Sequence, residues 1–233
     1  MSIIKVYGKN AGKLKDKTVL IVGIGGLGCT VSNLLARMQI RLILMDHDII
    51  DDTNLERQTL YDKDDLLKPK VNAAKNRLGK FTKIESVYEE LTKENIDAII
   101  KNKDIDLIMD CSDNIKTRLL LNDYCKKNKI NWIYSGAVSN IGTVFFIDNE
   151  NNSPCYQCIN QEKDGATSCE VGVLNTTVTT VASLAVNIAI NYLVNNKIED
   201  KLIRINMQNN ETSKLIVKTN KNCDACKKRY KYL

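Results

Sequence analysis

Four of the eight cysteines of this 233-residue chain form two Cys-x-x-Cys motifs, Cys155 with Cys158 and Cys223 with Cys226. Each pair offers two sulfur ligands on one tight turn, and four thiolates in a tetrahedral arrangement suit zinc. We therefore expect both pairs to hold one Zn²⁺ in a structural site, because four protein ligands leave no open position for catalysis. A redox disulfide is the alternative for either pair alone.

A glycine-rich turn of the form G-x-G-x-x-G follows an apolar run over 18–22 and precedes a helical pattern. Glycine permits the tight turn and lets phosphate oxygens approach backbone N–H groups at a positive helix end. Asp46 ends the next apolar run, 23 positions after the first glycine, where an acidic residue can hold ribose hydroxyls. The alternative is a turn that serves only helix–strand packing. The turn contains Gly23, Gly25, Gly26 and Gly28.

Charged residues farther along distinguish a triphosphate from a nicotinamide dinucleotide. Asp110 ends a fourth apolar run, and ligands of open α/β sheets bind outside the carboxyl ends of strands. A triphosphate with Mg²⁺ needs cations beside a carboxylate, because pyrophosphate must be neutralised as it leaves and the metal prefers carboxylate oxygen. Solvated surface charge is the alternative for Arg57 or Lys70 taken singly. The polar residues expected at this site are Asp48, Asn54, Arg57, Gln58, Lys70, Asp113, Asn114 and Arg118.

Short apolar runs alternate with helical patterns through the first half of the chain, which is typical of an α/β fold. We predict a Rossmann-like open, mainly parallel sheet with helices on both faces and a C-terminal strand pair. The strands are expected at 18–22, 41–45, 84–87, 105–109, 131–134, 142–148, 202–207 and 214–218. The helices are expected after the glycine turn and at 70–80, 91–101, 116–127 and 178–194, with a loop at 161–169.

Composition narrows the class of protein. A hydrophobic share of 43% with only two prolines excludes a mainly disordered chain. The net charge of +6 is mild and spread out, so nucleic acid is not an expected partner. We find no signal-peptide pattern, and polar residues interrupt the apolar stretch 171–194, so we expect a cytoplasmic protein without a membrane span. We predict a single domain over 1–233, with a nucleotide-binding half at 1–140 and a zinc-clipped half at 141–233.

Several motifs occur in the order found in the ThiF/MoeB/HesA family: GIGGLG, DHDIIDDTNLERQ, KPK, DCSDN followed by an arginine, CYQC, CEVGVL and a final CxxC. The chain resembles this family from about residue 14 to 226. The resemblance implies an adenylyltransferase of the ubiquitin-activating type. It would use ATP and Mg²⁺ to adenylate the C-terminal glycine of a ubiquitin-like or sulfur-carrier protein that ends in Gly-Gly. The half at 141–233 would bind this carrier.

The resemblance also implies roles for individual residues. Because the carrier's carboxylate is already a nucleophile, no protein base is needed, and catalysis depends on alignment and charge. Gly26 would pack against the phosphate of the adenylate, and Asp46 would hold the ribose. Asn54, Arg57 and Lys70 would contact the phosphates, and Asp110 would bind Mg²⁺. The residues that would shape the adenine and carrier-tail side are Asp113, Asn114 and Arg118.

Cys169 lies where similar enzymes often place a reactive cysteine, just before the segment EVGVL. Its thiolate could accept the activated acyl group as a thioester or join a sulfur relay. An inert thiol is the alternative. The remaining cysteines are interpreted as packing residues, and the single histidine, His47, as a local structural residue.

Members of this family usually begin with a segment whose arginine reaches the ATP site of the partner subunit. In this sequence no arginine precedes Arg37. Lys5 or Lys9 could substitute, activity could be reduced, or a different subunit could donate the arginine. We expect a homodimer, with such a heterodimer as the alternative. Two other functions stay open, a tRNA-modifying dehydratase of the same superfamily and a binding scaffold without turnover.

Overall fold

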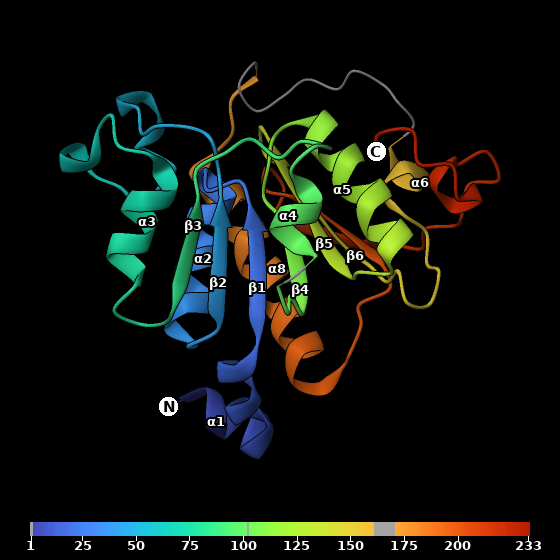
Figure 1. The fold of residues 1–233 in the computed structure, drawn as a ribbon, viewed down its shortest axis with the longest axis horizontal. Helices are drawn as coiled ribbons and strands as arrows, with labels where there is room; N and C mark the ends of the chain where they lie inside the picture. The colour runs from blue at the N-terminus through green and yellow to red at the C-terminus, as the bar shows by residue number, and fades with distance from the viewer. Residues whose placement is uncertain (1, 102, 161–170) are drawn as a thin grey trace.

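The structure is a computed structural model that describes residues 2–101, 103–160 and 171–233. The described residues form one eight-stranded sheet in the order β3-β2-β1-β4-β5-β6-β7-β8 (Figure 1). The first five strands in this order are parallel, and β6, β7 and β8 continue the sheet in antiparallel pairs. The predicted Rossmann-like, mainly parallel sheet is confirmed. Its strand order reverses between β1 and β4, the place where such sheets bind ligands.

The strands are β1 (Thr18–Val22), β2 (Arg41–Met45), β3 (Ile84–Val87), β4 (Leu107–Asp110), β5 (Trp132–Val138), β6 (Ile141–Ile147), β7 (Leu202–Asn206) and β8 (Glu211–Leu215). The helices are α1 (Ser2–Tyr7), α2 (Gly26–Arg37), α3 (Lys70–Leu78), α4 (Ile96–Ile100), α5 (Ile115–Asn128), α6 (Tyr156–Ile159) and α8 (Asn175–Asn195). Short 3₁₀ segments are η1 (Gly8–Asp16), η2 (Asp52–Asn54), η3 (Lys63–Asp65) and η4 (Ala225–Lys227).

Helices cover both faces of the parallel part of the sheet, which explains why its strands are apolar throughout. On β1, Val19 and Ile21 pack with residues of α2, α3 and α8 on one face. Leu20 and Val22 point to the other face and pack with residues of α4 and α5. In Figure 1, α4 and α5 lie in front of the sheet and α2 and α8 lie behind it.

Helix α8 is the one described helix that is long and apolar enough to cross a membrane by length and composition. In this fold 61% of its most apolar window is buried inside the protein. It packs so closely on β6 that a Cβ added to Gly142 would lie 2.1 Å from Cγ2 of Val181. We therefore interpret α8 as the central core helix behind the sheet.

Several expected elements have other bounds in the structure; the strand expected at 131–134, for example, is β5 at Trp132–Val138. Two of the differences have a local cause. The helix expected over 91–101 is shortened to α4, because the Asn95 side chain accepts a hydrogen bond from the Thr92 N–H and donates one to the Glu90 carbonyl, both at 2.8 Å. These bonds favour a turn. The last strand lies at Glu211–Leu215, earlier than the expected 214–218, because Asn210 takes a positive φ of 58° and closes a short hairpin. The loop expected at 161–169 lies outside the described residues.

Candidate functional site

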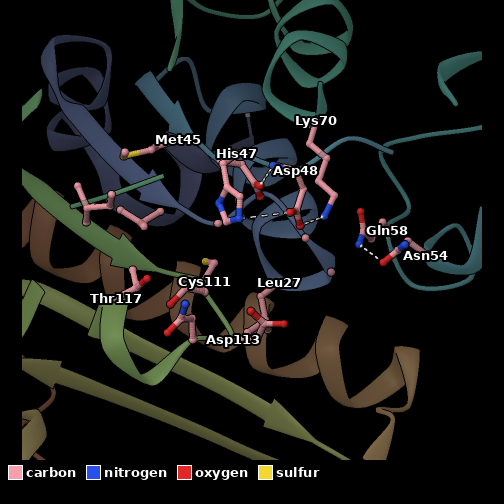
Figure 2. Close-up of a pocket in the computed structure, with 18 of the residues that line it drawn as sticks. Leu27, Met45, His47, Asp48, Asn54, Gln58, Lys70, Cys111, Asp113 and Thr117 are labelled. Carbon is pink, nitrogen blue, oxygen red and sulfur yellow. Dashed lines mark hydrogen bonds and ion pairs between the residues drawn. The ribbon is translucent and has the colours of Figure 1, made fainter. Parts of the chain in front are cut away.

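A cavity of about 310 Å³ opens at the carboxyl ends of β1, β2 and β4 (Figure 2). It brings together most of the polar residues that the sequence analysis selected, although they come from segments far apart in the chain. Those that line the cavity are Gly23, Gly25, Gly26, Asp46, Asp48, Asn54, Arg57, Gln58, Lys70, Asp113, Asn114 and Arg118.

The glycine turn leaves no room for side chains at its two ends. Gly23 has a φ of +89°, and a Cβ there would lie 2.8 Å from the carbonyl oxygen of Cys111. A Cβ on Gly28 would lie 2.0 Å from the Gly23 oxygen, so Gly28 serves the close packing of the turn and does not line the cavity. Helix α2 begins at Gly26 without a capping side chain, so its first N–H groups can receive an anion.

Asp46 fixes the shape of the loop around the glycine turn. It is 9% exposed, and one carboxylate oxygen accepts a hydrogen bond from the Ile24 N–H at 2.6 Å. The other oxygen accepts one from the Asp48 N–H at 2.8 Å. The Asp46 carboxylate faces the cavity and keeps acceptor positions that these two bonds do not use. A contact with ribose hydroxyls needs such free acceptors.

Lys70 supplies a buried cation at the start of α3. Its side chain is 6% exposed, and its Nζ lies 2.7 Å from an Asp48 oxygen that belongs to a half-exposed carboxylate. Figure 2 shows both groups pointing toward the cavity. A phosphate entering the cavity can therefore compete with Asp48 for this ammonium group.

The side-chain amide of Asn54, at the end of η2, holds the side chains of Arg57 and Gln58 in place. The Asn54 side-chain oxygen accepts hydrogen bonds from Arg57 Nη2 at 3.2 Å and from Gln58 Nε2 at 2.9 Å. The Arg57 side chain is 23% exposed. The Gln58 side-chain oxygen is buried without a hydrogen-bond partner. A buried acceptor of this kind is costly unless something donates to it, which suits a site built for a polar ligand.

Asp110 lies beneath the cavity, fully buried at the end of β4. One oxygen accepts hydrogen bonds from the Ser112 N–H and hydroxyl, at 3.0 and 2.6 Å. The other is 3.4 Å from Arg118 Nε and has no hydrogen-bond partner. Burial raises the pKa of Asp110, and the charge of Arg118 opposes this rise. A carboxylate oxygen held in this way fits the donor that Mg²⁺ prefers.

The loop before helix α5 and the first turns of this helix bring Asp113, Asn114 and Arg118 to the rim. The Asn114 oxygen caps the helix by accepting a hydrogen bond from the Lys116 N–H at 2.8 Å. Arg118 donates to the Ser112 carbonyl and lies 5.1 Å from the ring centre of Tyr134. A second cavity, of about 630 Å³, shares Asp113 and Arg118 with the first and extends over β7 and β8.

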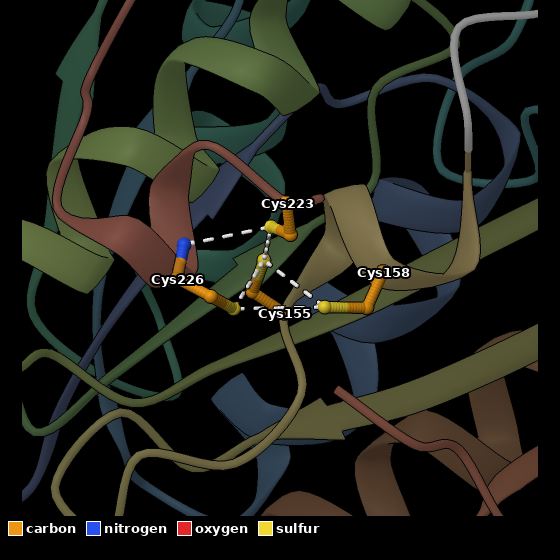
Figure 3. Close-up of side chains that lie close together, drawn as sticks. All are labelled: Cys155, Cys158, Cys223 and Cys226. Carbon is orange, nitrogen blue, oxygen red and sulfur yellow. Dashed lines mark hydrogen bonds between the residues drawn. The ribbon is translucent and has the colours of Figure 1, made fainter. Parts of the chain in front are cut away.

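The four paired cysteines gather into one cluster (Figure 3). Cys155 Sγ lies 3.4 Å from Cys223, 3.9 Å from Cys158 and 3.6 Å from Cys226, and the sulfurs of Cys158 and Cys226 are 3.6 Å apart. A disulfide needs about 2.05 Å. A tetrahedron of sulfurs about 2.3 Å from zinc has edges of about 3.8 Å. The cluster therefore fits Zn²⁺.

Backbone donors prepare this cluster for negative charge. The N–H groups of Asn220 and Cys226 point at the sulfurs of Cys158 and Cys223, both at 3.5 Å. Hydrogen bonds from Cys155 and Cys226, together with the Asn220 N–H, lower the pKa of the Cys158 thiol, whereas the hydrogen bonds with Cys158 and Cys226 raise the pKa of the Cys155 thiol. A thiolate is the form that binds metal.

The structure adds residues that sequence reasoning missed. The cavity is also lined by Val173, just before α8, by Val178, in the first turn of α8, and by Glu89 and Glu90, just beyond β3. The two glutamates could have been predicted, because ligands of open α/β sheets bind beyond the carboxyl ends of strands. Nothing in the sequence around the two valines indicates a binding site. His47 lines the same cavity, half-exposed beside Asp48. Cys169 lies outside the described residues.

Comparisons with known proteins agree with this geometry. Molybdopterin-synthase adenylyltransferase of Escherichia coli strain K12 is 33% identical over 177 residues, which are 73% of this chain and 70% of that protein. Sulfur carrier protein ThiS adenylyltransferase of Bacillus subtilis strain 168 is 32% identical over 222 residues, which are 92% of this chain and 65% of that protein.

The fold has a similar counterpart among solved structures. Escherichia coli MccB with MccA-N7isoAsn superposes with a TM-score of 0.79 at 23% identity, covering 93% of this chain and 69% of that one. This likeness concerns the fold alone. The sequence model of the ThiF family matches residues 2–227, which include the glycine turn, the strand-end carboxylates and both cysteine pairs. This chain belongs to the ThiF family.

Proposed function

We propose that this protein adenylates the C-terminal glycine of a ubiquitin-like or sulfur-carrier protein, with ATP and Mg²⁺. The observation that carries the proposal is a single cavity in which a glycine turn meets three cationic side chains above a buried strand-end carboxylate. A nicotinamide dinucleotide has no use for this combination, whereas the transfer of an adenylyl group requires it. The names of the two enzymes compared above support the same reaction class.

The proposed reaction is one displacement at phosphorus. An oxygen of the carrier's terminal carboxylate attacks the α-phosphorus of ATP, a new O–P bond forms, and the bond to the β-phosphate oxygen breaks. Pyrophosphate leaves with that electron pair, and the carrier is left as an acyl-adenylate. Arg57 and Lys70 stabilise the charge that builds on the phosphates, and the glycine turn fixes the α-phosphate on backbone N–H groups.

Two metals complete the proposal. Asp110 would hold Mg²⁺, which neutralises phosphate charge when it is bound. The four clustered cysteines would hold Zn²⁺ as a structural ion that ties the chain after β8 to the segment after β6. Ser112 contributes by fixing one Asp110 oxygen, so that the other is presented in one direction.

The second cavity is the place we propose for the carrier's tail. It adjoins the nucleotide cavity through Asp113 and Arg118, and apolar residues of β7 and β8 line its far side. A tail lying there would bring its terminal carboxylate next to the α-phosphate. We further propose a cytoplasmic homodimer, a nucleotide-binding half at 1–140, a carrier-binding half at 141–233, and an acyl or sulfur relay through Cys169.

Pyrophosphate exchange tests this function. The protein is incubated with ATP, Mg²⁺ and labelled pyrophosphate, with and without candidate carriers that end in Gly-Gly. We expect label to enter ATP only when a suitable carrier is present. The Asp110→Asn variant should bind ATP and lose at least about 99% of the exchange. Asp104→Asn, at an exposed aspartate outside the cavity, is the matched control and should leave exchange unchanged.

Other outcomes would support the other functions. ATP consumption that depends on tRNA and not on a carrier would favour the dehydratase-like reaction on a nucleoside. ATP binding without turnover on any substrate would favour a scaffold. Tight binding of NADH with indifference to ATP and Mg²⁺ would refute the nucleotide assignment itself.

A further inference from the structure

The two cysteine pairs lie on segments far apart in the chain, and side chains outside the cluster also hold these segments together. Cys155 is the N-cap of α6 and Cys158 lies within this helix, in the segment between β6 and α8, whereas Cys223 and Cys226 lie in the chain that follows β8. The two segments do not pair as strands in the described sheet. The described side chains between them therefore show what sets their spacing.

The side chain of Gln157 lies between these segments. Its amide nitrogen donates a hydrogen bond to the Asp123 carboxylate at 3.0 Å. Its amide oxygen accepts one from the Ala225 N–H at 3.4 Å, and the sulfur of Cys223 lies 3.7 Å from the same oxygen. A carboxylate can only accept and a peptide N–H can only donate, so the amide has a single orientation that satisfies both partners.

Asp123 is anchored on α5 and fully buried. Its second oxygen accepts a hydrogen bond from the Tyr232 N–H at 3.0 Å, near the C-terminal end of the second cysteine segment. The neighbouring residue Asn122, also fully buried, accepts a hydrogen bond from the Tyr156 N–H at 2.8 Å. Two adjacent residues of one helix thus hold both cysteine segments.

We propose that Gln157 and Asp123 are positioning residues for the zinc site, which set the distance between the two cysteine pairs before and after the metal binds. This inference rests on the proposed zinc site and concerns residues that do not touch the metal. In metal sites generally, partners that orient the ligands change metal affinity 10- to 100-fold when they are removed. The amide of Gln157 acts on the second pair through the backbone of Ala225.

The test measures zinc release. Purified protein is mixed with a chelating dye that changes colour on taking up Zn²⁺, and the rate of transfer is followed for the natural protein and for variants. Gln157→Met keeps the length of the side chain and removes both hydrogen bonds. Asp123→Asn is nearly isosteric and replaces one acceptor with a donor. We expect zinc to leave at least about ten times faster from each variant.

Three further measurements make the test specific. Gln208→Met, at an exposed glutamine outside the cluster, should release zinc at the natural rate. Cobalt in place of zinc should retain the absorption of a tetrahedral four-sulfur site in every variant, with weaker affinity in the variants of Gln157 and Asp123 and natural affinity in Gln208→Met. Gln157→Asn, whose shorter amide cannot span both partners, should behave like Gln157→Met.

Zinc release from Gln157→Met and Asp123→Asn at the natural rate would overturn the inference. A natural protein that takes up neither zinc nor cobalt would overturn the metal site as well. Neither result depends on adenylation, because pyrophosphate exchange tests the proposed reaction separately.

Discussion

Among single residues, Lys70 is the buried cation to which we assign a phosphate contact in the proposed function. A buried ammonium group is stable only with a partner, and in this structure the partner is the half-exposed Asp48 carboxylate. Since Asp48 can turn toward solvent, the lysine can exchange this carboxylate for a phosphate oxygen without leaving its buried position. The pair therefore holds a cation in place for the ligand.

Replacing Lys70 with methionine keeps the length of the side chain and removes its charge. We expect the kcat of pyrophosphate exchange to fall about 100-fold or more, which is the usual effect of losing one donor where charge develops. Lys68→Met is the control, because this nearby lysine is 55% exposed and does not line the cavity. Equal rates for the natural protein and Lys70→Met would contradict the role of Lys70.

The polar residues at strand ends could be selected from the sequence because type and position both carried information. Asp46 and Asp110 each follow a run of apolar residues, and the fold brings such positions to one edge. Tyr61, whose hydroxyl lies 2.9 Å from the Ile24 carbonyl and 3.3 Å from that of Lys70, was not predicted. Its contact joins segments whose approach depends on tertiary packing.

At the scale of elements, the turn between β1 and α2 depends on the absence of side chains. Gly28→Ala would force a Cβ to within 2.0 Å of the Gly23 oxygen, so backbone must move. We expect a loss of about 1–3 kcal/mol in the free energy of unfolding and a marked loss of ATP affinity. Gly12→Ala is the control, because its Cβ would meet nothing within 4 Å. Chemical denaturation and ATP titration measure the two effects, and an unchanged Gly28→Ala protein would refute this packing.

Asn114 combines a structural role with its predicted role in the nucleotide site. Its oxygen caps α5, so Asn114→Ala should cost about 1 kcal/mol of stability. Asn114→Asp keeps an acceptor for the Lys116 N–H and should retain the stability. If the amide also meets the nucleotide, Asn114→Asp should bind ATP more weakly. Thermal unfolding and ATP titration separate the two roles, and an Asn114→Ala protein as stable as the natural one would argue against the cap.

Three strands were predicted to the residue, whereas most other elements begin or end at different positions from those expected. The strands β1, β2 and β3 have the bounds expected from the sequence. Helix α4 and strand β8 differ, because Asn95 and Asn210 form turns that compete with the periodic pattern. The periodic pattern indicates which element can form, whereas local turns, such as those at Asn95 and Asn210, decide where it begins or ends.

At the scale of the whole molecule, the cysteine cluster links the chain after β8 to the segment that contains α6. Removing one ligand by Cys223→Ser should reduce zinc content and lower the melting temperature by several degrees, because metal binding contributes directly to folding. Cys125→Ser is the matched control, since this buried cysteine lies outside the cluster and should keep its zinc. Elemental analysis and calorimetry supply the measurements. A Cys223→Ser protein with full zinc would contradict the ligand assignment.

The pairing of the two cysteine segments could be expected from their spacing, but the residues that hold them could not. Gln157 and Asp123 are ordinary polar residues in the sequence, and only the packing of α5 against α6 brings them together. The pairing of β6 with β7 likewise joins segments distant in sequence.

Helix α5 enters the nucleotide cavity with its first turns and holds both cysteine segments with its middle. If zinc binding orders this helix, zinc and ATP raise each other's affinity by the same factor, since linkage between two ligands is reciprocal.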